Sequence, residues 1–587
     1  MISKLWMPFK LSYMFTSVCG EDTTHGVQPR LVSPPTDDNL NCNRSPFFTI
    51  RLCIIIASGC ILLSCTGKKD QDKKIFRYNQ PEGIASLDPA FAKNQAIMWG
   101  VHQLFNTLVE VDENLHIKPS LCRRWMVSDD RLTYTFILRD DVYFHNNAAF
   151  PGGKGRKMIA ADVAYSLQRI ISTTTASPGA WIFNNRIDTA DGFTALNDTT
   201  FQLKLLRPFH PILGILSMQY CSVVPHEAIG KYGTGFSRNP CGTGPFRFTR
   251  WEEGQVLLMA KNENYFERDS VGKRLPYVDG VKVSFLDNKA TEFLEFTQGR
   301  LDFINDIDAS FKDEVLTKKG ELRKEWKGRV VLSKHSFLNT EYLGILADTS
   351  NALVKNHPLK IKAVRQAINY GFDRNKMIMY LRNSLGTAAE SGFVPAGLPS
   401  YDSSKVKGYY YDVAKARQLL KEAGFAEGRG LPEIKLLTIP VYAELGSFVA
   451  KQLEDIGVKV QVEVVQKSLL LEQTAKSQAL FFRGSWMADY PDAENYLSVF
   501  YGKNPAPPNY TRYKNAAYDK LYESALLEQN DSTRYEMYRQ MDRMIIADAP
   551  IIPLWYDMVI RLIHPYVKDF SANSLNLLEL RTVRIEK

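Results

Sequence analysis

The 587-residue sequence lacks the common signatures of an enzyme active site. It contains no HExxH zinc motif, no GxSxG nucleophile turn and no CxxC pair. Its nine histidines are scattered, and His145, His210 and His226 stand near expected strand ends or turns, which favours structural or surface roles. The sequence therefore predicts no catalytic residue, no bound metal and no cofactor, and an enzyme is the weakest of the function classes considered.

Signatures of phosphate and nucleic-acid binding are also missing. The loop GGKGRK at 152–157 lacks the Walker spacing and indicates a solvated basic loop. In the turn NPCGTGPF at 239–246 no Lys-Ser/Thr follows, so Gly242 and Gly244, which tolerate positive φ, predict a chain reversal. The net charge of +9 comes from 73 basic and 64 acidic residues without a dense basic stripe, which argues against nucleic acid as a partner.

No apolar run approaches the roughly 18 residues of a transmembrane helix. The run at 52–64 has thirteen residues and follows a basic residue, as in the core of a signal peptide. LLSC at 62–65 resembles the lipobox of bacterial lipoproteins, which predicts that Cys65 is lipidated and becomes the first residue of the mature chain. A plain signal anchor and a weaker lipobox ending at Cys60 are the alternatives.

The segments beside this apolar run are expected to lie outside the folded protein. Residues 1–44 show no periodic pattern and indicate an upstream mis-start or an unusual extension, so 1–65 is assigned to this extension plus the signal peptide. Residues 66–74 predict a flexible charged tether. The mature protein is then tethered to one face of a membrane by lipid alone.

Cysteine is scarce after the expected lipid site. Cys122, Cys221 and Cys241 are the three that follow residue 65, too few for a disulfide framework. Because an exported compartment permits one bridge, we expect Cys221–Cys241 with Cys122 free, although the sequence alone leaves this pairing open.

What is present indicates a folded α/β protein of two or three domains. The composition is 45% hydrophobic and 23% charged, and the chain is too long for one ordinary domain. Beyond about residue 337, helical and strand patterns alternate, which favours a lobe with a partly parallel sheet. The expected helices lie at 96–111, 160–171, 413–425, 447–457 and 532–549, with a helix pair at 359–381. The expected strands lie at 199–206, 434–439, 458–465 and 550–563, with a strand running into a turn at 132–147.

One stretch, RGSWMADYPDAENY at 483–496, admits three interpretations: a solvated turn, an acid/base pair, or the mouth of a binding cleft. Asp489 and Asp492 stand three apart in a turn with proline, which does not fix two carboxylates across a scissile bond. With no nucleophile or metal signature nearby, the aromatic residues of this stretch favour ligand contact. Such sites lie preferentially between domains.

Seven segments, in order, resemble the oligopeptide- and dipeptide-binding solute-binding proteins of ABC peptide importers, over nearly the whole mature chain. They are SLDPAF, the stretch LFNTLVEV to FHNN, AADVAYSLQRI, NPCGTGPFRF, VRQAINYGFDRNKMI, ARQLLKEAGF and DAPIIPLWY. Cys241 departs from this pattern, standing where the family usually has valine. The resemblance implies an α/β fold like that of periplasmic binding proteins, with mixed sheets and two large lobes that close on ligand about two hinge strands. The implied parts are lobe I at 75–336 with an inserted subdomain at about 110–236, lobe II at 337–556, and a return to lobe I at 557–587.

The resemblance also implies roles for particular residues. Asp489 is expected to pair with the α-ammonium of a peptide and Arg483 to face its terminal carboxylate, while the backbone at Ser485 and Met487 pairs with the ligand's main chain. A turn cap for Asp489 and an ordinary salt bridge for Arg483 are the alternatives. Asp492 and Glu494 are read as turn and helix-start residues. The other expected ligand-binding residues are Trp486 and Tyr490 in lobe II and Lys93, Asn94 and Gln95 in lobe I.

The expected function is therefore a monomeric, lipid-anchored receptor in a bacterial cell envelope that captures peptides in the periplasmic space for an ABC permease. On the same scaffold the alternatives are a nickel chelate, haem or an oligosaccharide as ligand, or a peptide-sensing lipoprotein without a transport role. The sequence does not indicate peptide length, side-chain preference, or which membrane holds the lipid.

Overall fold

The computed structural model describes residues 73–587, which form one compact unit. The expected signal peptide, Cys65 and all but the last two residues of the expected tether lie outside the described residues. Within the described part of the chain, no helix combines the length and apolarity needed to cross a bilayer.

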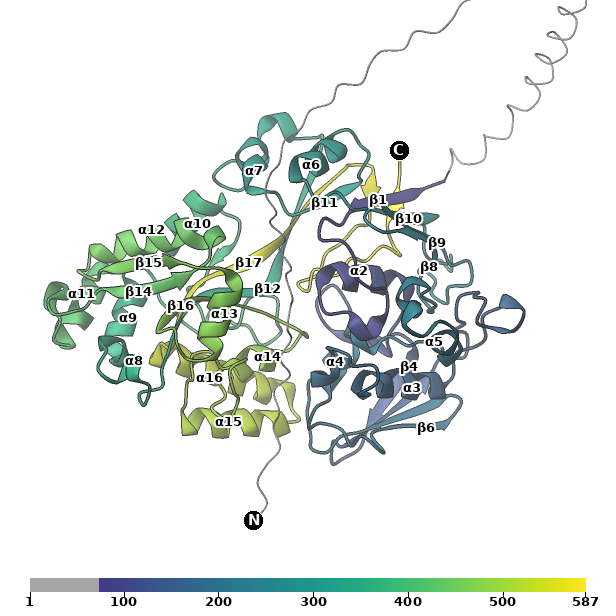
Figure 1. The fold of residues 1–587 in the computed structure, drawn as a ribbon, viewed down its shortest axis with the longest axis horizontal. Helices are drawn as coiled ribbons and strands as arrows, with labels where there is room; N and C mark the ends of the chain where they lie inside the picture. Colours follow the sequence, from purple (N-terminus) through teal and green to yellow (C-terminus); the bar gives the residue numbers. More distant parts are fainter. Residues whose placement is uncertain (1–72) are drawn as a thin grey trace, which may run out of the picture. The chain divides into compact units, whose positions relative to one another are not determined.

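The first part of the described chain builds two four-stranded sheets (Figure 1). One has the order β1-β10-β9-β8, with β1 parallel to β10 and the other neighbours antiparallel. The other is antiparallel in the order β4-β5-β7-β6 and has α3 against it. The strands are β1 (Ile75–Asn79), β4 (Cys122–Val127), β5 (Thr133–Leu138), β6 (Phe193–Asn197), β7 (Thr200–Lys204), β8 (Phe246–Glu252), β9 (Val256–Lys261) and β10 (Gly280–Ser284).

Several helices and a short hairpin complete this part of the chain. The expected helix at 160–171 is confirmed, and Asp162 in its first turn accepts a hydrogen bond from the Ile159 backbone N–H at 2.9 Å. The helices are α2 (Gln95–Leu104), α3 (Ala160–Ile171), α4 (Ile212–Leu216), α5 (His226–Tyr232), α6 (Lys289–Thr297) and α7 (Ala309–Val315), and the hairpin strands are β2 (Val109–Val111) and β3 (Ile117–Pro119).

A seven-stranded mixed sheet organises the second part. Its order is β11-β17-β12-β16-β14-β15, with β13 beside β17, and β14 runs parallel to both β15 and β16. The two long strands β12 and β17 pair along their length and run between the two groups of elements (Figure 1). The strands are β11 (Phe303–Asn305), β12 (Val331–Ile345), β13 (Thr387–Ala388), β14 (Ile434–Thr438), β15 (Val460–Val464), β16 (Phe481–Met487) and β17 (Ile551–Ile563).

Helices alternate with these strands, which confirms the expected α/β class. They are α8 (Ala352–Lys355), α9 (Lys362–Tyr370), α10 (Arg374–Arg382), α11 (Val413–Glu422), α12 (Ala443–Glu454), α13 (Lys467–Ala475), α14 (Glu494–Leu497), α15 (Ala516–Leu527) and α16 (Asp531–Asp548). The chain ends in the small ladder of β18 (Val567–Lys568) and β19 (Arg584–Ile585).

Separate hydrophobic clusters fill the two parts. The largest joins side chains from Phe76 to Val283 with residues near the C-terminus, such as Leu578 and Val583. Another runs from Leu343 to Trp555. The proposed lobe boundaries, near 336 and 556, are compatible with this grouping and stay a prediction.

Two local expectations differ from the structure. The helix expected at 96–111 ends at Leu104, and its last residues form β2 instead. Gly242 and Gly244 do not use positive φ: a Cβ there would lie 2.2 Å from the Leu104 carbonyl oxygen and 2.4 Å from the Leu104 carbonyl carbon, so close backbone approach requires glycine.

The disulfide expectation is wrong. Cys122, Cys221 and Cys241 are all free, buried thiols. The Cys221 sulfur lies 3.4 Å from the Ile215 carbonyl oxygen and the Cys241 sulfur 3.4 Å from the His145 carbonyl oxygen, so each packs in its own apolar site. Burial raises the pKa of the Cys241 thiol to about 12, which keeps it protonated and unreactive.

Gly424, two residues beyond the end of α11, provides a test of the local fold. Its φ is +87° and nothing lies within 4 Å of an added Cβ, so Gly424→Ala should cost about 1–2 kcal/mol of stability through backbone conformation alone. Gly230 in α5 has equally open space but no positive φ, so Gly230→Ala should stabilise by about 0.5–1 kcal/mol. Urea unfolding of both variants checks this, and equal effects would contradict it.

Candidate functional site: a free strand edge beside an unpaired carboxylate

The stretch 483–496 begins on β16, whose position in the sheet exposes one edge of its backbone. β16 is antiparallel to β12, with Asn339 opposite Met487 and Glu341 opposite Ser485. On its other side it pairs with β14 only at Phe481 and Phe482. From residue 483 onward, β16 therefore has a ladder on one side and an open edge on the other.

The hydrogen-bond register decides which backbone groups face that open edge. The Ala488 N–H donates to the Leu338 carbonyl oxygen at 2.9 Å, and the Leu346 N–H donates to the Leu480 carbonyl oxygen at 2.9 Å. Backbone hydrogen-bonding groups alternate in direction along an antiparallel strand. The N–H and C=O groups of the even-numbered residues of β16 therefore point toward β12. The N–H and C=O groups of Ser485 and Met487 point away from it, and both residues are exposed.

Asp489 lies just beyond the end of this edge. Its carboxylate reaches solvent but has no cationic partner among the described residues, and its nearest hydrogen-bond partner is the Asn495 amide at 3.4 Å. Surrounding protein raises the pKa of Asp489 through desolvation, which the hydrogen bond from Asn495 only partly offsets. A positively charged partner would stabilise this acid.

Asn495 holds the turn at Asp489 in shape, a role that its position in the sequence did not predict. Its side-chain oxygen accepts hydrogen bonds from the Trp486 indole N–H at 3.0 Å and from the Asp489 backbone N–H at 3.3 Å. Its only sequence signal was a polar residue six positions after Asp489. Trp486 is half-buried and packs against the neighbouring hydrophobic cluster, so its ring belongs in part to the core.

The rest of the stretch anchors the turn at Asp489 to the core. Glu494 is buried and accepts hydrogen bonds from the hydroxyls of Tyr490 and Tyr522. Asp492 accepts from the Glu494 backbone N–H at 2.8 Å, and burial raises the pKa of Asp492 to about 6. The reading of Asp492 and Glu494 as turn and helix-start residues is confirmed. Tyr490 is itself buried, so its side chain supports the segment from within.

Arg483, at the other end of the strand edge, is occupied. Its guanidinium forms an ion pair with Glu341 on β12 at 2.5 Å and lies 3.8 Å from the centroid of the Tyr442 ring. Glu341 also accepts hydrogen bonds from the Asn339 amide at 3.1 Å and from the Tyr442 hydroxyl at 3.3 Å. Both charged side chains are nearly buried.

A second arginine is paired in the same way on the neighbouring strand. Arg382 on α10 forms an ion pair with Asp557 on β17 at 2.8 Å and stacks on Trp555, 4.6 Å from the ring centroid. Asn339 links the two pairs, because its amide lies 3.3 Å from the Asp557 carboxylate.

The first part of the chain approaches this site through residues other than the expected ones. Burial raises the pKa of Tyr220 to about 12, and the negative charge of Asp489 contributes to this shift. The side chains of Tyr220 and Asp489 are therefore neighbours. A Cβ on Gly214 of α4 would lie 3.4 Å from Pro491. Among the described residues, no hydrogen bond or ion pair joins Lys93, Asn94 or Gln95 to 483–490; Lys93 is exposed and Asn94 caps α2.

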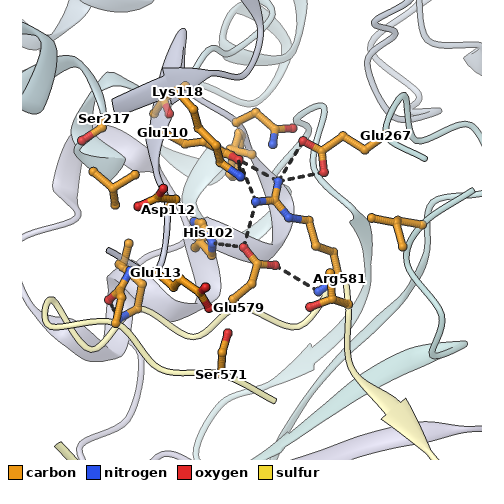
Figure 2. Close-up of a pocket in the computed structure, with 18 of the residues that line it drawn as sticks. His102, Glu110, Asp112, Glu113, Lys118, Ser217, Glu267, Ser571, Glu579 and Arg581 are labelled. Carbon is orange, nitrogen blue, oxygen red and sulfur yellow. Dashed lines mark hydrogen bonds and ion pairs between the residues drawn. The ribbon is translucent and has the colours of Figure 1, made fainter. Parts of the chain in front are cut away.

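A separate cavity of about 490 Å³ contains none of the expected site residues. Figure 2 shows the Arg581 guanidinium among the residues that line this cavity, where it forms ion pairs with Glu110, Glu267 and Glu579. Because this arginine is surrounded by carboxylates from three segments distant in sequence, the cluster joins the C-terminal segment to β2 and to the loop at 265–275.

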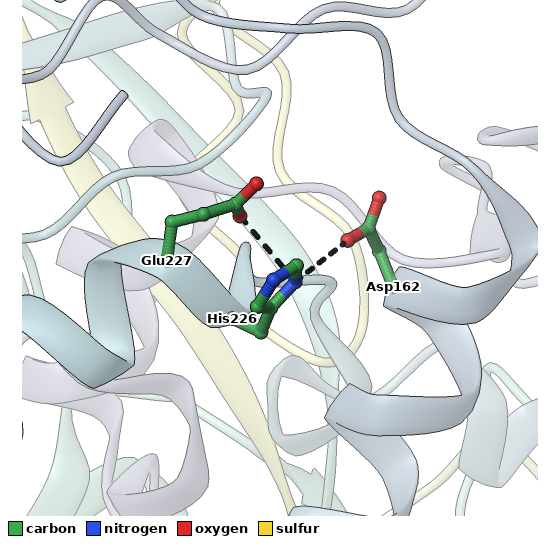
Figure 3. Close-up of side chains that lie close together, drawn as sticks. All are labelled: Asp162, His226 and Glu227. Carbon is green, nitrogen blue, oxygen red and sulfur yellow. Dashed lines mark ion pairs between the residues drawn. The ribbon is translucent and has the colours of Figure 1, made fainter. Parts of the chain in front are cut away.

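A third cluster brings Asp162, His226 and Glu227 within metal-ligand distance of one another (Figure 3). Arg156, from the loop expected to be solvated, donates hydrogen bonds to Asp162 at 2.7 Å and to Glu227 at 2.9 Å, and its guanidinium lies 3.4 Å from the His226 ring nitrogen. A guanidinium in this position already neutralises both carboxylates, so the cluster is an ion-pair network.

Comparison with known proteins identifies the family. Residues 116–508 match the model of the bacterial extracellular solute-binding proteins, family 5. The chain belongs to this family. Family 5 is defined by solute binding and not by catalysis, in agreement with the missing enzyme motifs, and the resemblance seen in the sequence is confirmed.

Relatives across family 5 carry different ligand names. Di/tripeptide-binding protein 1 of Pseudomonas aeruginosa is 27% identical over 86% of this chain and 93% of its own. Heme-binding protein A of Haemophilus influenzae is 26% identical over 86% of this chain and 91% of its own. The structure of DppA from Helicobacter pylori with the peptide STSA, 25% identical, has a TM-score of 0.68 over 88% of this chain and all of that one. The periplasmic-binding-protein fold expected from the sequence is thereby confirmed.

Proposed function

We propose that this family 5 protein captures peptides that carry a free amino terminus and delivers them to an ABC permease. One observation carries the proposal: an unpaired carboxylate, Asp489, lies at the end of a strand edge whose backbone groups at Ser485 and Met487 are free. A peptide can add to such an edge as a further strand, and its ammonium group complements the acid. Both features are common to all peptides, so they give affinity without side-chain selectivity.

The remaining parts of the proposal follow the sequence. The lipobox supports attachment to a membrane of the cell envelope through Cys65. Lys93, Asn94 and Gln95 are proposed to meet the peptide only when the lobes close about β12 and β17. Trp486 is proposed as a wall of the peptide site, and the protein is proposed to act as a monomer.

Native mass spectrometry of residues 66–587, purified without refolding, tests the proposed function. A closed cleft retains a tight ligand, so we expect added masses that fragment into short peptides. A single non-peptide mass, such as haem, or a metal chelate would contradict the proposal. If the protein is empty, calorimetric titration with a library of short peptides decides: binding supports the proposal, and no binding overturns it.

The pH dependence of peptide affinity is a further prediction. Asp489 must be ionised to pair with an ammonium group, and its pKa is raised above the usual value for aspartate. Affinity should therefore be constant around neutral pH and weaken as the pH falls through this raised pKa. Titration calorimetry between pH 8 and pH 4 measures it. An affinity that rises on acidification would contradict the assignment of Asp489.

A further inference from the structure

The charge balance around the proposed peptide site indicates which end of a ligand the protein recognises. The inference rests on the proposed function and concerns the opposite end of the ligand from the ammonium group. Both arginines on this face of the sheet, Arg382 and Arg483, already have carboxylate partners within the protein.

The pair of Arg483 with Glu341 is closed to competition. The Arg483 side chain is 11% exposed and that of Glu341 is 3% exposed. The Tyr442 ring covers the guanidinium, and the Arg483 Nε is buried without a partner and out of reach of solvent. A ligand carboxylate would have to displace Glu341 and leave a buried carboxylate unpaired, which is strongly unfavourable.

The Arg382–Asp557 pair is more open, with side chains 29% and 22% exposed. In this pair, too, one carboxylate neutralises the charge of one arginine. The Arg382 Nε donates to the Leu385 carbonyl oxygen at 2.9 Å, and its plane stacks on Trp555. A ligand carboxylate placed here would meet the negative charge of Asp557 together with the positive charge of Arg382.

Two acids, Asp489 and Asp306, have no ion-pair partner within the described residues. Asp306 lies just after β11. Asp306 accepts a hydrogen bond only from the Ile307 backbone N–H, at 2.8 Å, among the described residues. Desolvation by the surrounding protein raises the pKa of Asp306 and the charge of Asp557 adds to this, whereas the nearby cations Arg382 and Lys289 lower it. These groups together combine four carboxylates with two arginines and one lysine.

We propose that the protein does not recognise the terminal carboxylate of its ligand: Glu341 occupies Arg483 permanently, and the negative site selects peptides that carry net positive charge. Glu341 is then a specificity-determining residue. It takes the position on Arg483 that a ligand carboxylate would otherwise fill, and the ammonium end alone fixes the ligand's direction.

The test compares two tetra-alanine peptides, one with a free C-terminal carboxylate and one amidated, by titration calorimetry with the purified chain. The amidated peptide should bind as tightly as the free acid or up to about 10-fold tighter, because no unpaired positive group is available to bind the terminal carboxylate. If the free acid binds more than 10-fold tighter, the inference is wrong. If neither peptide, nor any other short peptide with a free amino terminus, binds, the proposed function itself fails.

Glu341→Gln sharpens the test, because glutamine keeps the shape and can still accept from Asn339 while releasing the charge of Arg483. This variant should shift the ratio of acid to amide affinity toward the acid by about 10-fold or more. An unchanged ratio in a variant that melts cooperatively would overturn the role of Glu341. Asp557→Asn, which releases Arg382 in the same way, provides a second measurement if Glu341→Gln does not fold.

Discussion

Asp489→Asn should weaken the binding of peptides with a free amino terminus by about 100- to 4,000-fold. The substitution keeps the hydrogen bond with Asn495 but removes the charge that pairs with the ammonium group. Loss of one partner from a buried ion pair costs about 3–5 kcal/mol, and each 1.4 kcal/mol is about tenfold in affinity. Asp489→Ala should abolish binding as well. N-acetylated peptides should bind poorly to wild type and to both variants.

Asp129 on the β4–β5 hairpin is a matched control, because it is exposed and has no hydrogen bond or ion pair among the described residues. Asp129→Asn should leave affinity unchanged. Titration calorimetry with the same peptide on wild type and the three variants makes the comparison. Equal binding of acetylated and free peptides by wild type would show that Asp489 does not read the ammonium group.

Arg581→Met should destabilise the fold by about 3–5 kcal/mol at neutral pH, since it leaves Glu110, Glu267 and Glu579 without their shared cation (Figure 2). The free energy of unfolding in urea measures this. Lys118→Met is the control: Lys118 pairs with Glu110 in the same cluster at 2.9 Å, but its side chain is 45% exposed, so its loss should cost less than about 1 kcal/mol.

The pH dependence of this difference follows from the pKa values. Burial works to raise the pKa of Glu579, but Arg581 brings it down to about 2, so its stabilising effect is present above the unfolded value of about 4.5 and is lost as the pH falls toward 2. In Arg581→Met, burial is no longer countered by Arg581 and the carboxyls take up protons on folding. The difference in the free energy of unfolding between wild type and Arg581→Met should therefore become smaller from pH 7 to pH 4. A difference that stays constant would contradict this explanation.

Elements with strong local signals were predicted close to their observed bounds. The helix at 160–171 has an acid in its first turn and regular apolar spacing, and both act within a few residues. The helix at 413–425 ends near Gly424 for a similarly local reason. The helix expected to continue to 111 instead ends at Leu104, because β2 gains a pairing with β3 that a helical pattern does not contain.

For the candidate site, the sequence identified the segment but not the contacts of its members. The motif at 483–490 placed Asp489 and the backbone at Ser485 and Met487 in one short stretch. The partner of Arg483 is Glu341, 142 positions earlier in the chain, and the free edge of β16 depends on where β14 ends. Asn495, which ties Trp486 to Asp489, had no signal beyond its polarity.

The sequence by itself determined the family, the α/β class and the segment that carries the site, since these depend on periodicity, on capping and turn residues, and on motifs in a fixed order. Only the tertiary structure decided that Cys221 and Cys241 lie in separate apolar sites, that Arg483 is neutralised while Asp489 is not, and that Arg581 joins three distant segments. Ion pairs and strand edges depend on which residues meet in space, and the number of residues between two positions in the sequence does not determine whether they meet.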